Sequence, residues 1–258
     1  MKTLREIYDY REMIFSLVRR DLNGRYKGSI LGFFWTFLNP LLQLCVYTVV
    51  FSVILKNDIK DFYLYLFIGL VPWIFFSTSV SGGTTCIWSQ QDMVKKIYFP
   101  REVLPIAFVT SQFVNMLLTF LVVFFVVAIS GRGLNLLAML YLPVIMVVEY
   151  ILALGMAFLT SSMTVYLRDL EYLSGIITMA WQFLTPIMYS VDIVPKRLLP
   201  IFYLNPMTPI IVAYRDILYE GKIPQLSTLI HATFFGVFMV VVGWLTFGKL
   251  KRHFAEEM

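Results

Sequence analysis

The sequence predicts an all-α integral membrane protein with six transmembrane helices, an amphipathic helix at the membrane interface and short re-entrant helices before the last span. Of the 258 residues, 59% are apolar and 14% charged, whereas soluble proteins average about 45–50% apolar and about 25% charged residues. Four stretches carry no charged side chain, and each reaches the roughly 20 residues that cross a bilayer. They are 31–55, 62–91, 103–131 and 172–191.

Six membrane spans are predicted along the chain, separated by short polar loops. They cover residues 30–55, 63–88, 103–129, 136–165, 172–190 and 226–248. An even number of crossings returns the tail, 249–258, to the side on which the chain starts. Lys and Arg number fourteen on that side and seven on the other, so the positive-inside rule predicts that both termini are cytoplasmic. The net charge of +5 then reflects orientation, and no nucleic-acid partner is needed to explain it.

The first 28 residues are predicted to lie at the cytoplasmic interface rather than in the bilayer. Over the first 22 residues, apolar side chains recur three, four or seven positions apart, with charged residues between them: Leu4, Ile7, Tyr8, Ile14, Phe15, Val18 and Leu22. This pattern predicts one amphipathic helix on the membrane surface. Its polar face could also meet a cytoplasmic partner, or the segment could be only a basic flank that orients the first span.

The connection 191–225 between the last two spans is too long for a turn and too apolar for a solvated loop. Its prolines break any continuous helix, which predicts two short helices that dip into the outer leaflet and return. Such an element would close the outer end of a pore, and we expect it to act as a gate. The residues expected to shape this gate are Pro195, Pro206, Pro209 and Tyr214.

The chain is predicted to form a single transmembrane domain over 1–258, without an energy-converting domain of its own. Its longest polar segment has about 30 residues, below the about 50 residues that a domain needs. A phosphate-binding G-x-x-x-x-G-K-S/T sequence is also missing, because Ile223 follows Gly221-Lys222 and Leu250 follows Gly248-Lys249. The two cysteines lie in apolar spans and are expected to pack as small hydrophobes. No metal or cofactor is therefore expected on this chain.

Short segments between residues 15 and 225 carry distinctive combinations of Gly, Pro, aromatic and basic residues. They are 19–35 (RRDLNGRYKGSILGFFW), 38–42 (LNPLL), 69–76 (GLVPWIFF), 94–102 (VKKIYFPRE), 186–189 (PIMY), 194–195 (VP) and 204–207 (LNPM), the last followed by Tyr214-Arg215. In this order the segments resemble the ABC-2 type permeases that export polysaccharides.

The resemblance implies a six-span subunit that pairs with a second copy of itself to form a channel. Two copies of a separate ABC nucleotide-binding subunit would drive it, with ATP and Mg on that partner, so this chain would not be an enzyme. Typical cargoes are O-antigens, capsules or teichoic acids, usually attached to a lipid carrier. The resemblance also implies the bacterial inner membrane as the location, with membrane lipids around the subunit.

The loop after the second span is expected to couple this chain to its ATPase partner. In transporters of the family that it resembles, a short helix at this place docks into the ATPase. The residues expected to make the contact are Asp92, Val94, Lys95, Lys96, Ile97, Tyr98, Phe99 and Arg101. A solvated positive-inside loop would explain the two lysines alone, but not the apolar residues beside them.

Three cations near the start of the first span are candidate contacts for the substrate as it enters: Arg20, Arg25 and Lys27. They could hold the pyrophosphate of a lipid-linked glycan. They could equally bind ordinary anionic lipid headgroups, at about 1 kcal/mol each. In the same region, Gly28 and Gly32 are expected to allow close packing of helices, within the subunit or between two copies.

Aromatic side chains make up 17% of the chain, and we expect some of them to line the glycan path, because sugar rings slide over flat apolar faces. The candidates are Phe33, Phe34, Trp35, Phe37, Tyr47, Trp181, Phe183 and Tyr189. For each, packing within the protein or an interfacial belt is the alternative. Glu149 is the only acid inside a predicted span, and it is expected to line the channel or to form a buried pair, with His231 as the candidate partner.

Three other functions stay open from the sequence. An ABC-2 exporter of a lipid or a drug would show the same loops and aromatic content. A membrane-embedded glycosyl- or acyltransferase would need paired acids, or a His beside an acid, and Asp169 with Glu171 is the nearest such pair. A secondary transporter would be expected to show inverted repeats and several intramembrane charges.

Overall fold

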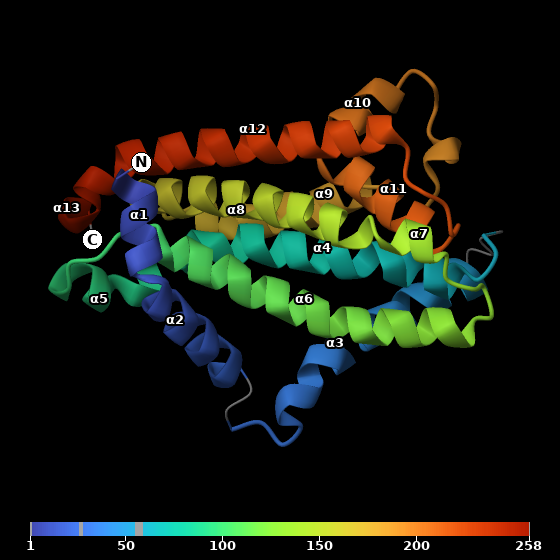
Figure 1. Ribbon diagram of the computed structural model, residues 1–258, viewed down its shortest axis with the longest axis horizontal. Helices are drawn as coiled ribbons and strands as arrows, with labels where there is room; N and C mark the ends of the chain where they lie inside the picture. The colour runs from blue at the N-terminus through green and yellow to red at the C-terminus, as the bar shows by residue number, and fades with distance from the viewer. Residues whose placement is uncertain (1, 26–27, 55–58, 258) are drawn as a thin grey trace.

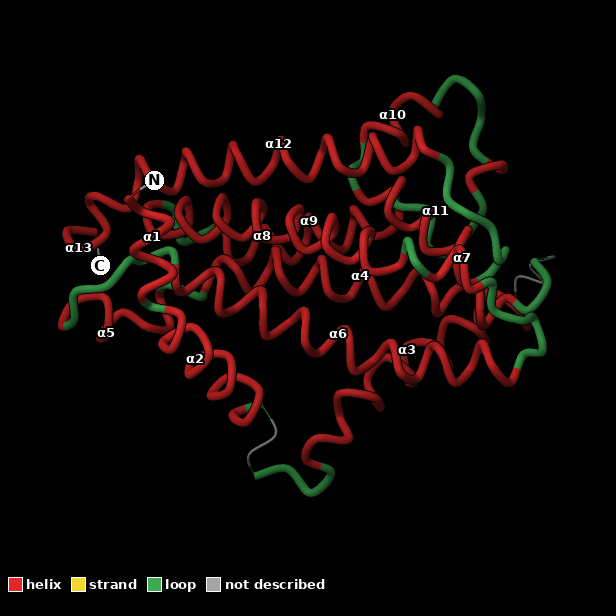
Figure 2. Tube along the Cα trace, viewed as in Figure 1, coloured by secondary structure: helices red, strands yellow, loops and turns green. Residues whose placement is uncertain are grey.

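The computed structural model shows a bundle of helices, most of which run along one long axis. It describes residues 2–25, 28–54 and 59–257, and these residues contain no strand (Figure 2). Four long helices lie along the axis (Figure 1): α4 (Phe62–Thr85), α6 (Val103–Ile129), α8 (Leu142–Tyr166) and α12 (Leu226–Leu250). Both chain termini lie at one end of the bundle, the terminal end. The predicted all-α class is confirmed.

Within the described ranges, five helical stretches are long and apolar enough to cross a membrane. They are Trp35–Ser52, Phe62–Thr85, Val103–Ile129, Leu136–Tyr166 and Leu226–His253. These stretches correspond to five of the six predicted spans, and the third agrees with its predicted limits. The lengths and apolar composition of these helices support a multi-pass membrane protein.

The predicted fifth span, 172–190, is shorter than expected. It corresponds to α9 (Leu170–Leu184), whose 15 residues reach about 22 Å, less than the about 30 Å of the hydrocarbon core. The helix ends because Pro186 follows: a proline disfavours helical backbone at the residue before it, and Thr185 is extended. The predicted end at 190 is wrong. The prediction followed the stretch without charged residues, which continues past this proline, whereas the helix does not.

The predicted fourth span, 136–165, is broken near its start into α7 (Leu136–Met139) and α8. Pro143 stands in the first turn of α8, where a helix needs no backbone N–H donor. Asn135 caps α7, because its side-chain carbonyl accepts a hydrogen bond from Leu137 N at 3.0 Å. The start of α7 and the start of α8 therefore each have a local cause.

The N-terminal segment forms two helices instead of the one predicted, α1 (Lys2–Asp9) and α2 (Arg11–Gly24). The break falls at Tyr10, whose backbone leaves the helical region with φ −92° and ψ 15°. α2 lies against α6, and its Ile14 and Leu17 pack against the buried cluster that contains Phe99. Periodicity alone could not locate the break, because apolar residues keep a helical spacing through it.

The first membrane span begins at Trp35, later than predicted. It is formed by the helix α3 (Trp35–Thr48) and the π-helical η2 (Val49–Ile54), and the 3₁₀ turn η1 (Gly32–Phe34) precedes it. Gly28 and Gly32 have positive φ, 86° and 47°, and no described atom lies within 4 Å of where a Cβ would stand. The expected close helix packing at these glycines is wrong within the subunit; their conformational freedom instead serves the turn between α2 and α3.

α4 is the central helix of the bundle. It contacts α3, α6, α8, α9 and α11 (Met207–Leu218). Five successive or nearly successive side chains show how completely it is covered, since each has no exposed surface: Leu64, Leu66, Phe67, Ile68 and Leu70. A helix that is apolar on all sides is expected at such a position.

α8 and α12 pack so closely that their backbones touch at two glycines. A Cβ at Gly243 would stand 2.2 Å from the carbonyl oxygen of Gly155, and a Cβ at Gly155 would stand 2.5 Å from the backbone nitrogen of Val240. Small residues make this approach possible, as is typical of helix pairs in membranes. The pair ties the last helix to the rest of the bundle.

We expect Gly243→Ala to push α8 and α12 apart, because backbone atoms rather than a flexible side chain stand in the way of the added methyl group. Overpacking of this kind costs about 1–3 kcal/mol, so the melting temperature of the detergent-purified protein should fall. Gly175→Ala on α9 is the control, since no described atom lies within 4 Å of its Cβ position. Equal melting temperatures for the two variants would contradict the close contact.

Candidate functional site

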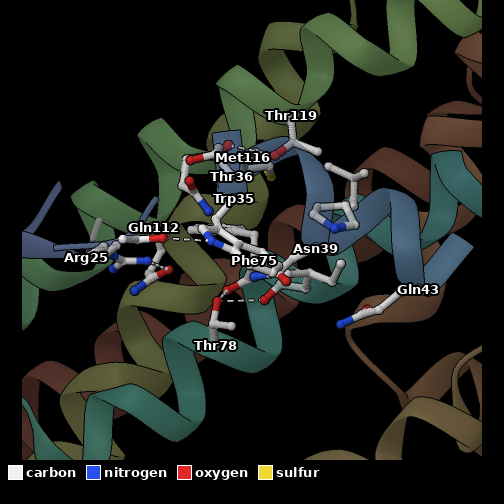
Figure 3. Close-up of a pocket in the computed structure, with 15 residues that line it drawn as sticks. Arg25, Trp35, Thr36, Asn39, Gln43, Phe75, Thr78, Gln112, Met116 and Thr119 are labelled. Carbon is white, nitrogen blue, oxygen red and sulfur yellow. Dashed lines mark hydrogen bonds between the residues drawn. The ribbon is translucent and has the colours of Figure 1, made fainter. Parts of the chain in front are cut away.

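A cavity of about 640 Å³ lies between the start of α3 and the flanks of α4 and α6 (Figure 3). Uncharged polar side chains form most of its wall: Ser29, Thr36, Asn39, Gln43, Thr78, Gln112, Asn115 and Thr119. Arg25, Trp35 and Phe75 line it as well, with other apolar residues (Figure 3). A predicted entrance residue, Arg25, and a predicted path residue, Trp35, therefore share one cavity.

This cavity is polar although it lies at bilayer depth. Thr78 is about two turns and Val71 about four turns from the terminal end of α4, or roughly 10 and 21 Å. The side-chain amides of Asn39 and Gln43 belong to exposed residues and form no hydrogen bond with another described residue. Facing hydrocarbon, such amides would be costly, so they indicate a hydrated space or a site for a polar ligand.

Arg25 is held at the cavity by a network within the subunit. Its Nη2 lies 2.6 Å from Asp21 Oδ2, and its Nη1 donates to Gln112 Oε1 at 3.0 Å. The Ser111 hydroxyl donates to the same Asp21 oxygen. Because Asp21 neutralises the guanidinium, an anionic ligand at Arg25 would have to compete with that carboxylate.

The second predicted entrance cation, Arg20, lies beside a different hollow of about 440 Å³ between α2 and the terminal ends of α4 and α6. Its Nη2 donates to Gln90 Oε1 at 2.8 Å. Arg25 lines this hollow as well, so both described entrance cations belong to its wall. The third predicted cation, Lys27, lies outside the described residues.

The path aromatics predicted on the first span have different surroundings. Trp35 lines the cavity and donates from Nε1 to Ser29 Oγ at 3.0 Å. Phe34 is 72% exposed and meets Phe37 edge-on, with ring centroids 6.5 Å apart. The side chain of Phe33 is outside the described part. Trp35 is thus the member of this group that faces the polar cavity.

Tyr47 joins the first span to α9. Its hydroxyl accepts a hydrogen bond from the Gln182 side-chain amide at 3.3 Å. The next residue, Phe183, is 60% exposed on α9, and the hydroxyl of Tyr189 donates to its backbone carbonyl at 2.8 Å. One side-chain hydrogen bond therefore links α3 to α9.

Trp181, also predicted to line the path, is engaged in packing. Its ring meets Trp73 and Phe76 edge-on, with centroid distances of 6.5 and 5.2 Å. Its Nε1 donates to Asn205 Oδ1 at 2.9 Å. Within this subunit, Trp181 connects α9 with α4 and with the segment that enters α11.

Glu149 lies in the core between α8 and α11 and has no exposed surface. Its Oε2 accepts a hydrogen bond of 2.6 Å from the Tyr214 hydroxyl. The expectation of His231 as its partner is wrong, since that side chain is exposed on α12. The sequence could not pair Glu149 with Tyr214, because the contact exists only after α11 has folded back against α8.

The predicted gate divides into a packed half and an exposed half. α11 is buried along most of its length against α4, α8 and α12, and Pro206, Pro209 and Tyr214 are buried with it. The preceding half, from η4 (Val191–Ile193) to α10 (Leu199–Leu204), carries the exposed Pro195. Figure 1 shows α10 at the outer corner of the bundle. Only this half can move without unpacking the core.

Asn205 forms hydrogen bonds at the junction between the exposed half and the packed half of the predicted gate. Its Oδ1 accepts from the Trp181 indole and from Met207 N at 3.0 Å, and its Nδ2 donates to Thr185 Oγ1 at 2.9 Å. The residue therefore caps the start of α11 and ties it to the end of α9.

Arg215, which the sequence analysis named only as part of a segment that resembles the family, is buried at the same junction. Its Nη2 donates to the carbonyl of Ile187 at 2.6 Å, and its Nη1 donates to the carbonyl of Pro186. The guanidinium also lies 3.5 Å from the centre of the Tyr65 ring. Carbonyls left free where α9 ends before Pro186 thus receive their donors from α11.

A second arginine ties the loops at the end opposite the termini. Arg132 Nη2 lies 2.8 Å from Asp61 Oδ2, and its Nη1 donates to the carbonyl of Tyr219 at 3.2 Å. Its guanidinium lies 3.9 Å from the centre of the Tyr219 ring. The loops before α4, after α6 and after α11 are therefore connected through one side chain.

The predicted coupling residues lie at the terminal end, on α5 (Gln91–Lys96) and the loop that follows it (Figure 1). Tyr98 is 86% exposed and Ile97 58% exposed. Val94 and Phe99 are buried in a cluster shared with the ends of α6, α8 and α12. The loop thus presents an apolar tip while two of its side chains anchor it.

The charged coupling residues are distributed around this tip. Lys96 Nζ lies 3.6 Å from Asp92 Oδ1, with both side chains mostly exposed. Lys95 is exposed as well. Arg101 donates to the backbone carbonyl of Lys251, at the end of α12. The loop is therefore attached to the C-terminal tail, a contact that sequence spacing does not reveal.

Comparison with known proteins shows which family this chain resembles. Residues 12–219 match the family described as ABC-2 type transporter. An O-antigen export system permease protein RfbA of Myxococcus xanthus is 32% identical over 260 residues, covering all of both chains. An RfbA of Klebsiella pneumoniae is 29% identical over 95% of this chain and 94% of its own. The polysialic acid transport protein KpsM of Escherichia coli is 20% identical over 88% of this chain and 89% of its own.

Asp216 lies near the end of α11, outside the five membrane-crossing stretches, and is a partly buried carboxylate in the predicted gate region. Burial raises its pKa to about 6; the nearby Glu220 carboxylate adds to the rise and Lys222 opposes it. An unfolded Asp has a pKa of about 3.9. The folded state therefore holds a proton where the unfolded state does not, and stability falls as the pH rises from about 4 to about 6.

We expect Asp216→Asn to raise the melting temperature at neutral pH, because the variant avoids a buried charge, and we expect this gain to shrink as the pH falls through about 6. The measurement is a series of melting curves of the detergent-purified protein at different pH. Asp9→Asn, at an exposed position on α1, is the control. A gain that does not depend on pH would contradict this account.

Proposed function

The chain belongs to the ABC-2 type transporter family, among its polysaccharide-export permeases, and we propose that it is the channel-forming subunit of an ATP-driven exporter. The cargo is a lipid-linked polysaccharide of the O-antigen kind, moved from the cytoplasm across the bacterial inner membrane. The observation that carries this proposal is the similarity to an O-antigen export permease over the whole length of both chains.

The proposed architecture has six crossings, with α9 as the fifth, and both termini in the cytoplasm. α9 is short, but beyond Glu171 in its first turn its exposed large side chains are apolar: Tyr172, Leu173, Ile176, Ile177, Met179, Phe183 and Leu184. Such a face needs lipid or another protein against it. A second copy of the chain, placed against α3 and α9, would cover it and complete a channel.

The polar cavity supports a glycan as cargo. Neutral amides and hydroxyls can bond sugar hydroxyls, while Trp35 and Phe75 offer flat apolar faces beside them. Because these donors and acceptors are uncharged, each bond is weak enough for the chain to move on. Arg20 and Arg25 stand closer to the terminal end, where an anionic carrier group would pass first.

Energy would come from a separate ABC ATPase, present in two copies, which binds ATP and Mg. This chain's part is mechanical: Tyr98 and Ile97 project toward the partner, and the buried Val94 and Phe99 pass its motion into the bundle. α2 rests on the cluster that contains Phe99, so the N-terminal helix would move with the loop. The exposed gate half at the opposite end could then open while α11 stays packed.

We expect the tagged chain, purified from its native membrane in mild detergent, to bring an ABC ATPase with it in equal amount. Tyr98→Ala should release that subunit, because its exposed ring would lose its contact. Tyr203→Ala on α10, an exposed tyrosine at the opposite end, is the matched control. Purification of the chain alone would contradict the proposal that an ATPase drives this subunit, and it would favour a secondary transporter or a transferase.

We also expect Asn39→Leu to lower the amount of polysaccharide at the cell surface about three- to tenfold. The variant removes the proposed hydrogen bonds between the Asn39 amide and the glycan, worth about 0.5–1.5 kcal/mol. The amount of the chain in the membrane should not change. Leu42→Ala, an exposed position of α3 that does not line the cavity, is the control. Normal export by the Asn39 variant would remove the cavity from the glycan path.

A further inference from the structure

A third hollow, of about 420 Å³, lies between the coupling loop and the C-terminal tail. It is rich in cations, which come from both segments: Lys95, Lys96, Arg101, Lys251 and Arg252. Among the lining residues that the structure describes, Glu6 on α1 supplies the only carboxylate. The apolar tip residues Ile97 and Tyr98 form part of its rim. This basic hollow is therefore built by two parts of the chain that are far apart in sequence.

The tail is fixed to the root of the coupling loop by a buried ion pair. The ammonium of Lys251 pairs with Glu102, which is almost fully buried at the start of α6. Arg101 donates to the backbone carbonyl of Lys251, and its guanidinium lies 5.7 Å from the centre of the Phe254 ring. Two adjacent residues of the loop thus hold the first residues of the tail.

The tail is also packed into the bundle. Phe254 in α13 (Phe254–Glu257) has no exposed surface and meets Phe247 edge-on, with ring centroids 5.5 Å apart. The Tyr166 hydroxyl donates to the carbonyl of Leu250 at 2.9 Å, which ties the end of α12 to the end of α8. The tail's cations are therefore presented at a defined place, beside the loop.

Two cations of the basic hollow remain available to a partner. Arg252 is exposed and forms no ion pair with another described residue. Lys96 pairs only with Asp92, at 3.6 Å and with both side chains mostly in solvent, which is a weak interaction. Lys251 and Arg101, by contrast, are engaged within the subunit. The available charges thus come from both segments that line the hollow, one from the loop and one from the tail.

We propose that the coupling loop and the C-terminal tail form one docking surface, and that the basic hollow receives an acidic side chain of the ATPase subunit. The inference rests on the proposed function. Charge complementarity selects an acidic partner group. The exposed Tyr98 and Ile97 on the rim select a protein surface over a lipid headgroup, and the loop lies at the extreme terminal end of the molecule (Figure 1).

A tail contact gives the ATPase a second point of attachment. Through the loop alone, its motion would reach α8 and α12 by way of the apolar cluster around Val94 and Phe99. The ion pair of Lys251 with Glu102 would add a charged link to the end of α12, and α12 touches α8 at Gly155 and Gly243. The helix that follows the outer gate would then move together with the helices that precede it.

The test is the amount of ATPase retained per tagged chain after purification in mild detergent, at low and at high salt. Arg252→Glu and Lys96→Glu should each lower it about tenfold, and the unsubstituted complex should weaken as salt rises. Arg252→Lys should retain the ATPase, because it keeps the charge. Lys249→Glu is the matched control: it is exposed at the end of α12 but does not line the hollow.

Three other outcomes would contradict the inference, and each identifies a different reason. If Tyr98→Ala releases the ATPase and Arg252→Glu does not, the loop docks without the tail. If Arg252→Glu weakens only the binding of purified protein to vesicles of anionic lipid, the hollow is a headgroup site. If no ATPase accompanies even the unsubstituted chain, the proposed function fails, and this inference fails with it.

Discussion

The structure depends on one constraint: at bilayer depth, a polar group must find its partner inside the protein or face a hydrated space. One carboxylate oxygen of Glu149 meets this constraint by accepting from Tyr214, and the two terminal nitrogens of Arg215 meet it by donating to the carbonyls of Pro186 and Ile187. Asn39 and Gln43 have no such partner among the described residues, and they lie on a cavity wall. The same rule thus produces both the rigid core and the candidate path.

The two ends of the bundle are built for different tasks. At the end opposite the termini, Arg132, Arg215 and Asn205 connect loops that would otherwise be independent, while the segment from η4 to α10 is largely exposed. At the terminal end, the Lys251–Glu102 pair fixes the tail, while Tyr98 and Arg252 point outward. One end is held together by side-chain contacts between its loops, and the other exposes the surface to which we propose that the ATPase binds.

Sequence patterns located features that depend on neighbouring residues. Runs without charge gave the long helices, with the third span at its predicted limits, and prolines gave the broken connection before α12. They failed where a local signal competed with the pattern: Pro186 ended α9 early, and Tyr10 divided the N-terminal helix. Ile97 and Tyr98, singled out as apolar residues in a charged loop, are exposed at the tip as a docking element requires.

The sequence by itself determined the helical class, the membrane setting and the positions of the candidate coupling loop and gate, because these follow from composition and from spacing along the chain. The tertiary structure alone decided which side chains meet. Tyr214 rather than His231 binds Glu149, Arg25 and Trp35 share a cavity, and Lys251 holds the root of a loop about 150 residues away in sequence. Such contacts depend on how helices are stacked and rotated against each other, and hydrophobic periodicity carries no information about which neighbour a helix will face.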